Sequence, residues 1–156
     1  MSVTIISDYG FCIVKDEYFK DYPHPQHMDN KNETRPYYLT IRADDGIMWL
    51  IPISHQVSKY QNKILKYENR NRKCVLYYIA KFIGEDRAFL IGNAIPVSEK
   101  YIKKPFTVKN VPYVLQSESD RKEILSRLKK YLSLVRHGKL KPAVDILSIE
   151  SALKNK

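Results

Sequence analysis

The stretch YYLTIRADDGIMWLIPI, residues 37–53, contains two apolar runs separated by the turn sequence Ala43-Asp44-Asp45-Gly46. An Asp-Gly pair tolerates the positive backbone angles of a tight turn, so this pattern is typical of a β-hairpin. We therefore expect Tyr37–Arg42 and Ile47–Ile53 to pair as antiparallel strands. An antiparallel pair in this position predicts a fold built around a sheet.

Other strand-like segments lie on both sides of the hairpin. They are Ser2–Ile6, Phe11–Val14, Lys73–Ile83, Arg87–Ile91 and Asn93–Val97. Gly84-Glu85-Asp86 is expected to form the turn of a hairpin between Lys73–Ile83 and Arg87–Ile91. The proline in Asn93–Val97 marks that segment as an edge strand or a strand end. Asp16 is expected to cap a brief helical turn. The pattern predicts a strongly curved, mainly antiparallel β-sheet or partial barrel, because a small sheet has to manage its open edges.

The C-terminal third changes to a helical period. Apolar residues recur every three or four positions from Ile124 to Val135, Ser117 or Ser119 supplies an N-cap, and Gly138 stands where a C-cap glycine belongs. A shorter helix is expected from Asp145 to Leu153. The chain is therefore expected to have an α+β fold with C-terminal helices.

The composition fits one basic domain, residues 1–156, because 156 residues suffice for a single core. Lys+Arg 27 against Asp+Glu 17 gives a formal charge of +10, which favours a polyanionic partner, nucleic acid first. The sequence has no apolar run that could span a membrane, and its first nine residues lack the features of a signal peptide. We therefore expect a cytoplasmic protein with no membrane partner.

Cysteine and histidine usage does not indicate a metal site. Cys12 and Cys74 lie in apolar, strand-like surroundings and are expected to be reduced core residues. His24 and His27 have no third ligand at a recognisable spacing. There is no P-loop, HExxH helix or carboxylate cluster, so we expect no cofactor, no metal and a metal-independent chemistry.

The strand that ends at Ile53 leads directly into Ser54 and His55, with Lys59 shortly afterwards. RNA carries its own nucleophile, the 2′-hydroxyl, so a protein need only move protons and stabilise charge on the phosphorane. His55 suits proton transfer because histidine titrates near neutrality. Ser54 would orient the 2′-hydroxyl or a phosphate oxygen, Lys59 would stabilise the pentavalent intermediate, and Arg35 would grip the phosphate through two donors. An ordinary turn would contain Ser54 and His55 equally well.

A basic tract follows along the chain. Its cations, opposed only by Glu68, are Lys59, Lys63, Lys66, Arg70, Arg72 and Lys73, with Tyr60 and Tyr67 interleaved. Cations mixed with aromatic rings are typical of a surface that binds an RNA backbone and stacks on its bases. The sequence leaves open whether the tract is such a surface or a solvated face.

The order of these segments resembles that of the ToxN/AbiQ-like toxins of type III toxin-antitoxin systems, which include the CptN and TenpN branches. The resemblance runs from about Phe11 to Leu153. It rests on four landmarks in order: Arg35–Ile41 entering the hairpin, Trp49–Ser54 with a downstream lysine, Ile91–Val97, and the terminal Val144–Glu150.

The resemblance implies a curved sheet with helices, related to the MazF and Kid toxins, and an endoribonuclease toxin inhibited by a small RNA antitoxin. Family members cut the repetitive antitoxin precursor into pseudoknots, which then occupy the toxin's RNA groove in symmetric toxin-RNA assemblies. The family's active-site loop falls on Ile53–Lys59, so Ser54 takes the serine role and Lys59 the lysine role. Arg35 lies close to a basic residue of the family site. This chain departs from the family pattern at Ile53, where a threonine is common, and at His55-Gln56.

Several residues are candidates for RNA binding, to the antitoxin pseudoknots and to cellular RNA substrates. Tyr37 or Tyr38 would replace a tyrosine that family members carry in the preceding loop. The full set is Tyr37, Tyr38, Tyr60, Lys63, Lys66, Arg70, Arg72, Lys73 and Asn93.

Two other functions fit the same sequence. A non-catalytic RNA-binding protein would use the basic tract for phosphate binding, with Ser54-His55 as a plain strand end. A DNA-binding regulator would use the helix from Ser119 to Gly138 as a reading element. No second helix precedes that one at helix-turn-helix spacing, which counts against the regulator.

Overall fold

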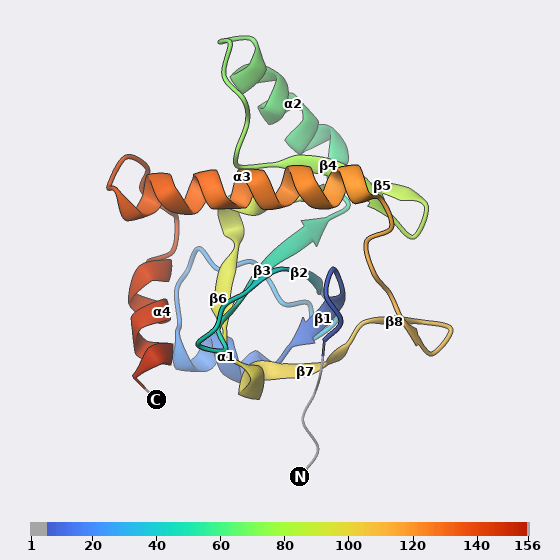
Figure 1. Ribbon diagram of the computed structural model, residues 1–156, viewed down its shortest axis with the longest axis vertical. Helices are drawn as coiled ribbons and strands as arrows, with labels where there is room; N and C mark the ends of the chain where they lie inside the picture. The colour runs from blue at the N-terminus through green and yellow to red at the C-terminus, as the bar shows by residue number, and fades with distance from the viewer. Residues whose placement is uncertain (1–5, 156) are drawn as a thin grey trace.

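The computed structural model describes residues 6–155 and shows an α+β fold (Figure 1). The main sheet contains β1 (Phe11–Val14), β2 (Pro36–Arg42), β3 (Met48–Ser54), β4 (Tyr78–Phe82), β5 (Glu85–Phe89), β6 (Ile95–Val97) and β7 (Ile102–Pro105). Its order is β4-β5-β3-β2-β1-β7, with β6 paired to β3 as well, and every pairing is antiparallel. A separate hairpin joins β8 (Thr107–Val108) and β9 (Val111–Pro112).

The central hairpin is confirmed. β2 pairs with β3, with Tyr38 opposite Ile51, and Gly46 adopts a φ of 87° while its N–H donates to the Ala43 carbonyl at 3.0 Å. A side chain at Gly46 would be strained in this conformation, which is why an Asp-Gly turn suits the position.

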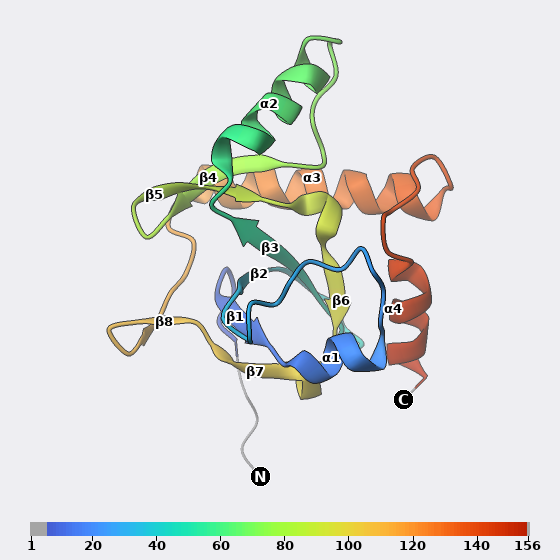
Figure 2. The ribbon, with the colours of Figure 1, turned by 180° about the vertical axis from the view of Figure 1, so that it is seen from behind.

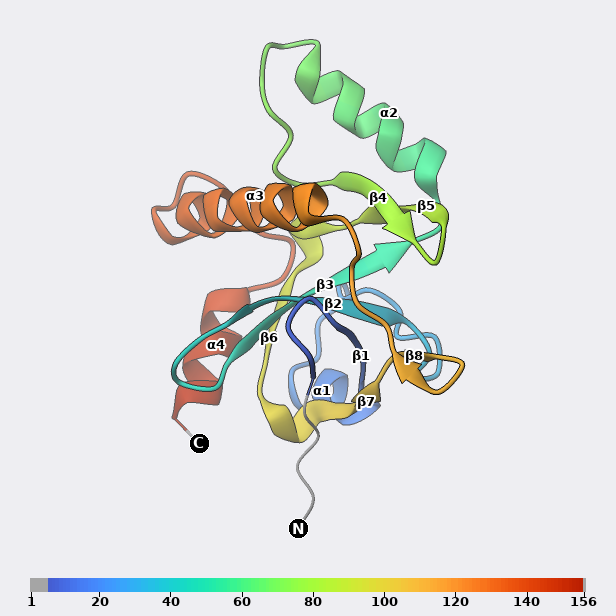
Figure 3. The same ribbon diagram turned by 45° about the vertical axis from the view of Figure 1, so that its right-hand side comes forward.

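The β3 strand is paired on both sides and changes neighbour along its length. Its first part, Met48–Leu50, pairs with β6, whereas Ile53 and Ser54 pair with β5. The β4-β5 hairpin thereby lies apart from the rest of the sheet, as Figure 3 shows. The sheet does not close into a barrel, because β4 and β7 end its strand order and are not paired with each other within residues 6–155.

Some strand predictions were wrong in extent. The segment predicted as Lys73–Ile83 forms a strand only over Tyr78–Phe82. Its turn is Ile83-Gly84 rather than Gly84-Glu85-Asp86, because both residues adopt positive φ and β5 already begins at Glu85. The sequence analysis missed β7, β8 and β9, which are short and contain few apolar residues. The strand predicted over Ser2–Ile6 lies outside the described residues except for Ile6.

Four α-helices accompany the sheet within residues 6–155: α1 (Asp16–Asp21), α2 (Val57–Glu68), α3 (Glu118–Arg136) and α4 (Ile146–Lys154). Short 3-10 turns, η1 (Ile91–Asn93) and η2 (Glu99–Tyr101), flank β6. The two C-terminal helices are confirmed: Ser117 caps α3 by accepting from the Asp120 N–H, and Asp145 caps α4 by accepting from the Ser148 N–H. Gly138 follows α3 with a φ of 71°.

The first two helices differ from expectation. The N-cap of α1 is Lys15, and the predicted cap Asp16 is instead the first helical residue. The α2 helix was not predicted, because Gln56 stands at its N-cap without a side-chain hydrogen bond and only Tyr60 and Ile64 are buried along it. A helix with a weak cap and two buried anchors gives little periodic signal.

The core lies between the sheet and α3, which crosses the molecule in Figures 1 and 2. The buried face of α3 consists of Ile124, Leu128, Tyr131, Leu132 and Val135. Cys12 and Cys74 are free, buried thiols, as expected, and burial raises the pKa of Cys12 to about 12.

A two-point ion pair joins the C-terminal helices. Arg136 on α3 donates to both carboxylate oxygens of Glu150 on α4, at 2.8 and 3.0 Å, and Glu150 is 8% exposed. A two-point bond to a mostly buried carboxylate is stronger than an ordinary surface pair. It therefore fixes α4 against α3.

We predict that Glu150→Gln lowers the free energy of unfolding by about 1–2 kcal/mol, because the charged hydrogen bonds are lost while Arg136 stays partly solvated. Urea denaturation followed by circular dichroism measures the change. The control is Glu118→Gln, which breaks an exposed pair with Lys122 and should change stability by about 0.5 kcal/mol or less. Equal effects of the two variants would contradict this account of α4.

Candidate functional site

The C-terminal end of β3 opens into a small pocket of about 130 Å³. Three segments far apart in the sequence form it: the loop of residues 29–36, the end of β3, and the β4-β5 hairpin. The lining residues are Lys31, Thr34, Arg35, Pro36, Ile53, Ser54, His55, Phe82 and Arg87. Of the four predicted catalytic residues, the pocket therefore brings together Ser54, His55 and Arg35.

Ser54 is the last residue of β3 and is 8% exposed. Its backbone is held opposite Ala88 of β5, and its Oγ accepts a hydrogen bond from the Gln56 N–H at 3.1 Å. A hydroxyl has one donor and two acceptor sites, so this bond orients Oγ and leaves its proton free to donate. Ser54 is thus a fixed hydroxyl at the wall of the pocket, and His55 follows it as an exposed residue at the rim.

The N-terminus of α2 begins two residues after His55. It has no side-chain cap, and no acidic residue stands in its first turn. The unpaired N–H groups of a helix N-terminus favour a nearby negative charge. The pocket is thus bordered by a helix end that suits an anion.

Arg35 has a structural role at the pocket that the sequence analysis did not predict. It is 7% exposed, its Nε donates to the Asp29 carbonyl at 2.6 Å, and its Nη1 donates to the Ile53 carbonyl at 2.7 Å. Two of the three guanidinium nitrogens are therefore engaged with the backbone. The expected two-point grip on a phosphate does not fit this arrangement, and Arg35 instead ties the 29–35 loop to the residue before Ser54.

The loop itself has an uncommon backbone. Lys31, Asn32 and Glu33 all adopt positive φ, at 51°, 57° and 61°. The left-handed region costs roughly 1–2 kcal/mol for each residue with a side chain, although asparagine tolerates it better. Buried Asn30 holds the turn, since its backbone carbonyl accepts hydrogen bonds from the backbone N–H groups of Thr34 and Arg35. This turn carries Lys31, Thr34 and Arg35 to the pocket.

The sequence analysis missed Arg87, which lines the pocket from β5. Its Nη2 lies 2.8 Å from Glu85 Oε2, its Nη1 donates to the Asp86 carbonyl at 2.8 Å, and the Glu85 carboxylate is largely exposed. Exposed ion pairs contribute little and exchange readily, so Arg87 can turn toward an anion in the pocket. Arg87 could have been found only through the pairing of β5 with β3, which brings its neighbour Ala88 opposite Ser54.

Lys59 does not line the pocket. It is exposed on α2, and its Nζ lies 5.2 Å from the centre of the Tyr60 ring. Tyr60 is 7% exposed and packs against Tyr77, with 4.9 Å between ring centres. The Tyr60 ring is thus covered, and its position is at odds with the predicted stacking on RNA.

Tyr37 and Tyr38 are core residues, each 1% exposed, and burial raises the pKa of both hydroxyls. The sheet is covered on both faces at this point, so neither ring can stack on a base. The prediction that Tyr37 or Tyr38 binds RNA in this way is therefore wrong. Asn93 ends η1 and lines a separate small hollow with Tyr131. It is not among the residues that line the Ser54 pocket.

The basic tract gathers on α2 and the segment that follows it. Lys63, Lys66, Arg70 and Arg72 line one depression of about 440 Å³ together with Tyr67 and Tyr77. Lys73 lies 3.3 Å from Glu123 of α3 and is partly neutralised by it. Four of the five predicted RNA-binding cations are thus brought together, along the second half of α2 and the segment after it.

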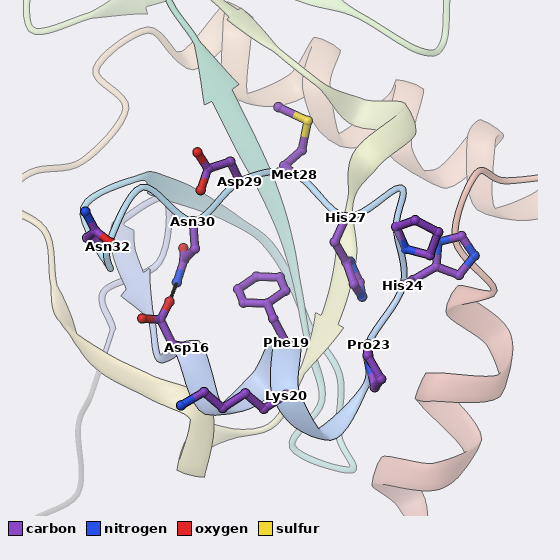
Figure 4. Close-up of a pocket in the computed structure, with 11 residues that line it drawn as sticks. Asp16, Phe19, Lys20, Pro23, His24, His27, Met28, Asp29, Asn30 and Asn32 are labelled. Atoms are coloured by element: carbon purple, nitrogen blue, oxygen red, sulfur yellow. Dashed lines mark hydrogen bonds between the residues drawn. The ribbon is translucent and has the colours of Figure 1, made fainter.

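A larger cavity of about 650 Å³ lies beside α1, on the same loop that forms the Ser54 pocket (Figure 4). It contains His24 and His27. The His27 ring contacts the Tyr22 carbonyl through Nε2 at 2.8 Å, and burial lowers its pKa. The two histidines do not form a metal site, because residues 6–155 hold no group of three His, Cys, Asp or Glu side chains that could bind a metal ion. Over the same range, no helix has the length and apolar character needed to cross a bilayer.

Comparison with known proteins places the fold. No protein-family model matches the chain, and no curated protein matches it. Among solved structures, it is similar to ToxN, from the work "A processed non-coding RNA regulates a bacterial antiviral system". The TM-score is 0.62 and the identity is 13%, over 91% of this chain and 95% of the other. The expected ToxN-like fold is confirmed, whereas the relation to MazF and Kid stays a prediction.

We predict that Glu33 stabilises the pocket loop only while it is ionised. Its carboxylate accepts from Lys103 Nζ and from the Asp16 N–H, both at 2.7 Å, and these bonds, the lysine first, lower its pKa. A lowered pKa in the folded state adds stability above the ordinary glutamate value of about 4.3 and loses it as pH falls through the folded value.

Glu33→Gln should therefore lower the melting temperature at pH 7, and the two melting curves should converge as the pH is taken below about 4. The control, Glu17→Gln, removes the same charge from an exposed position on α1. A deficit for Glu33→Gln that is unchanged at pH 3 would contradict the role of the ionised carboxylate.

Proposed function

We propose that the chain is a metal-independent endoribonuclease toxin that cleaves RNA by attack of the 2′-hydroxyl on the adjacent phosphate. The observation that carries this proposal is the pocket at the end of β3, where a fixed hydroxyl, an imidazole and two guanidinium groups come from three separate segments: Ser54, His55, Arg35 and Arg87. The similarity to ToxN supports the same class of activity.

The proposed reaction needs no external reactant. A bond forms between the 2′-oxygen and phosphorus, the bond from phosphorus to the 5′-oxygen breaks, and one proton passes from the 2′-hydroxyl to the departing 5′-oxygen. The products are a 2′,3′-cyclic phosphate and a 5′-hydroxyl. His55, whose imidazole is the one that lines the pocket among the described residues, is the group that we propose moves that proton.

The remaining groups stabilise charge on the phosphorane. Ser54 can donate its hydroxyl proton to a non-bridging phosphate oxygen, since its acceptor site is oriented by Gln56. Arg87 supplies a guanidinium whose partners, the exposed Glu85 carboxylate and the Asp86 carbonyl, both lie at the surface of the same hairpin. The third nitrogen of Arg35, Nη2, adds positive charge from the wall. In this scheme Arg87 takes the role first expected of Lys59, which was to stabilise the pentavalent intermediate.

RNA affinity is proposed to come from α2 and the segment after it. Lys63, Lys66, Arg70 and Arg72 line one depression that extends from the second half of α2 to the segment after it. The proposed partners are cellular RNA substrates and an RNA antitoxin, whose precursor the toxin processes into inhibitory pseudoknots within a symmetric assembly. The regulating RNA of the antiviral system to which ToxN belongs supports this partner class.

A non-catalytic RNA-binding protein is the second candidate. The observation that favours it is the engagement of two Arg35 nitrogens with backbone carbonyls, which makes Arg35 a structural residue. A DNA-reading role for α3 has less support. Three of its arginines already donate to protein acceptors: Arg121 to Leu115, Arg127 to Cys74 and Arg136 to Glu150.

Replacing Ser54 by alanine tests the proposal. We expect Ser54→Ala to abolish growth arrest on expression in a bacterial host while leaving RNA affinity nearly unchanged, because the hydroxyl contributes to the transition state rather than to phosphate binding. The control is Ser58→Ala, on the exposed side of α2. A Ser54→Ala variant that is folded and fully toxic would rule out the serine assignment.

The role of His55 has its own test. His55→Ala should slow single-turnover RNA cleavage by roughly two to four orders of magnitude, the usual range for general acid-base catalysis, and should flatten the pH-rate profile near neutrality. His24→Ala, a loop histidine outside the pocket, serves as the control. Near-parental cleavage with an unaltered pH profile would make His55 a turn residue.

A further inference from the structure

The segment that follows α2 runs down to α3 (Figures 1 and 3). A cavity of about 600 Å³ lies between the two. Its apolar wall has contributions from both sides: Val75 and Leu76 from the segment, and Leu134 and Leu140 from the end of α3 and the turn beyond it. The volume falls in the range of ligand pockets, roughly 300–1,000 Å³. The pocket at Ser54 is smaller, at about 130 Å³.

The rim of this cavity is cationic. Arg72, Lys73, Arg127, Lys130 and Lys139 line it, and none of the described residues that line it is Asp or Glu. Glu123, just outside, lies 3.3 Å from both Lys73 and Arg127 and offsets their charge. The charge that remains comes from Arg72, Lys130 and Lys139, each on a different segment. An apolar wall under such a rim suits a flat ring that carries an anion.

Tyr67 connects this cavity to the basic depression on α2. It is half-buried, and both hollows are lined by Tyr67 and Arg72. An RNA strand lying along α2 therefore passes the mouth of the cavity. The site is distinct from the Ser54 pocket, because the two hollows share no lining residue.

We infer that this cavity holds one unstacked nucleotide of the bound RNA, remote from the phosphate that is cut. The base lies against the leucines and the Tyr67 ring, and its phosphate lies among Arg72, Lys130 and Lys139. Single-stranded loops and ends of RNA present such splayed bases, and aromatic side chains stack on them without strict sequence preference. This inference rests on the RNA-binding part of the proposed function and does not depend on cleavage.

The experiment measures the affinity of the Ser54→Ala protein for a 20-nucleotide single-stranded RNA, by fluorescence anisotropy over a range of salt. Ser126→Trp places an indole at the cavity from an exposed position on α3, and Ser119→Trp adds the same ring where it lines none of the cavities described above. Ser126→Trp should weaken binding about five- to hundredfold, the range expected for losing one stacked base. Ser119→Trp should bind like the parent.

A pair of charge variants tests the rim. Lys130→Gln should reduce the slope of log affinity against log salt by about 0.7, the value for one phosphate contact in single strands, whereas Lys129→Gln, one position away and outside the cavity, should not. If Ser126→Trp fails to fold, the comparison of Lys130→Gln with Lys129→Gln still tests whether the cavity binds a nucleotide.

The outcomes separate the two claims. Folded Ser126→Trp and Lys130→Gln variants that bind like their controls would overturn the nucleotide site, even if the unsubstituted chain cleaves RNA. A parent chain that binds no RNA would overturn the site and the proposed function together. The same two cavity substitutions can also be made in the chain that keeps Ser54. If both weaken RNA binding and neither slows the cleavage of a dinucleotide, the result would support a site remote from catalysis.

Discussion

The fold depends on the burial of β3 between two sets of partners. Every residue from Met48 to Ser54 is buried, and β2 lies along one side of the strand while β6 and then β5 lie along the other. A strand paired in this way has its register fixed by every neighbour, since a slip of one residue would exchange its two faces. The position of Ser54 is therefore a consequence of core packing, and the site needs no flexible element to place its hydroxyl.

The sequence predicted the features that depend on local signals. The Asp44-Asp45-Gly46 turn, the cap at Ser117 and the glycine at position 138 each act within a few residues, and all three stand where expected. The pairing of β5 with β3 joins residues some 34 positions apart, Ser54 and Ala88, and no local pattern specifies it. Arg87 was missed for that reason. Tyr37 and Tyr38 were misassigned because β2 is covered on both faces, so adjacent residues are buried alike.

The proposed function divides catalysis and affinity between different surfaces. The pocket at Ser54 is small, and its shape depends on a turn with three consecutive positive φ angles that Asn30 and Arg35 hold in place. Backbone strain of this kind persists only where surrounding contacts enforce it. The cations of α2, by contrast, are mostly exposed and contribute charge over a wide surface. RNA can therefore be held tightly by α2 while few groups touch the scissile phosphate.

The measurement that tests the central claim most directly is analysis of the RNA ends produced by the purified chain in the presence of EDTA. Attack by the 2′-hydroxyl leaves 2′,3′-cyclic phosphate and 5′-hydroxyl ends, and the account predicts both at an undiminished rate without divalent ions. Retention of intact RNA would contradict catalysis and leave a binding protein. Products with 5′-phosphate ends would show that water or a metal-bound hydroxide is the nucleophile, and would contradict the proposed role of the Ser54 pocket.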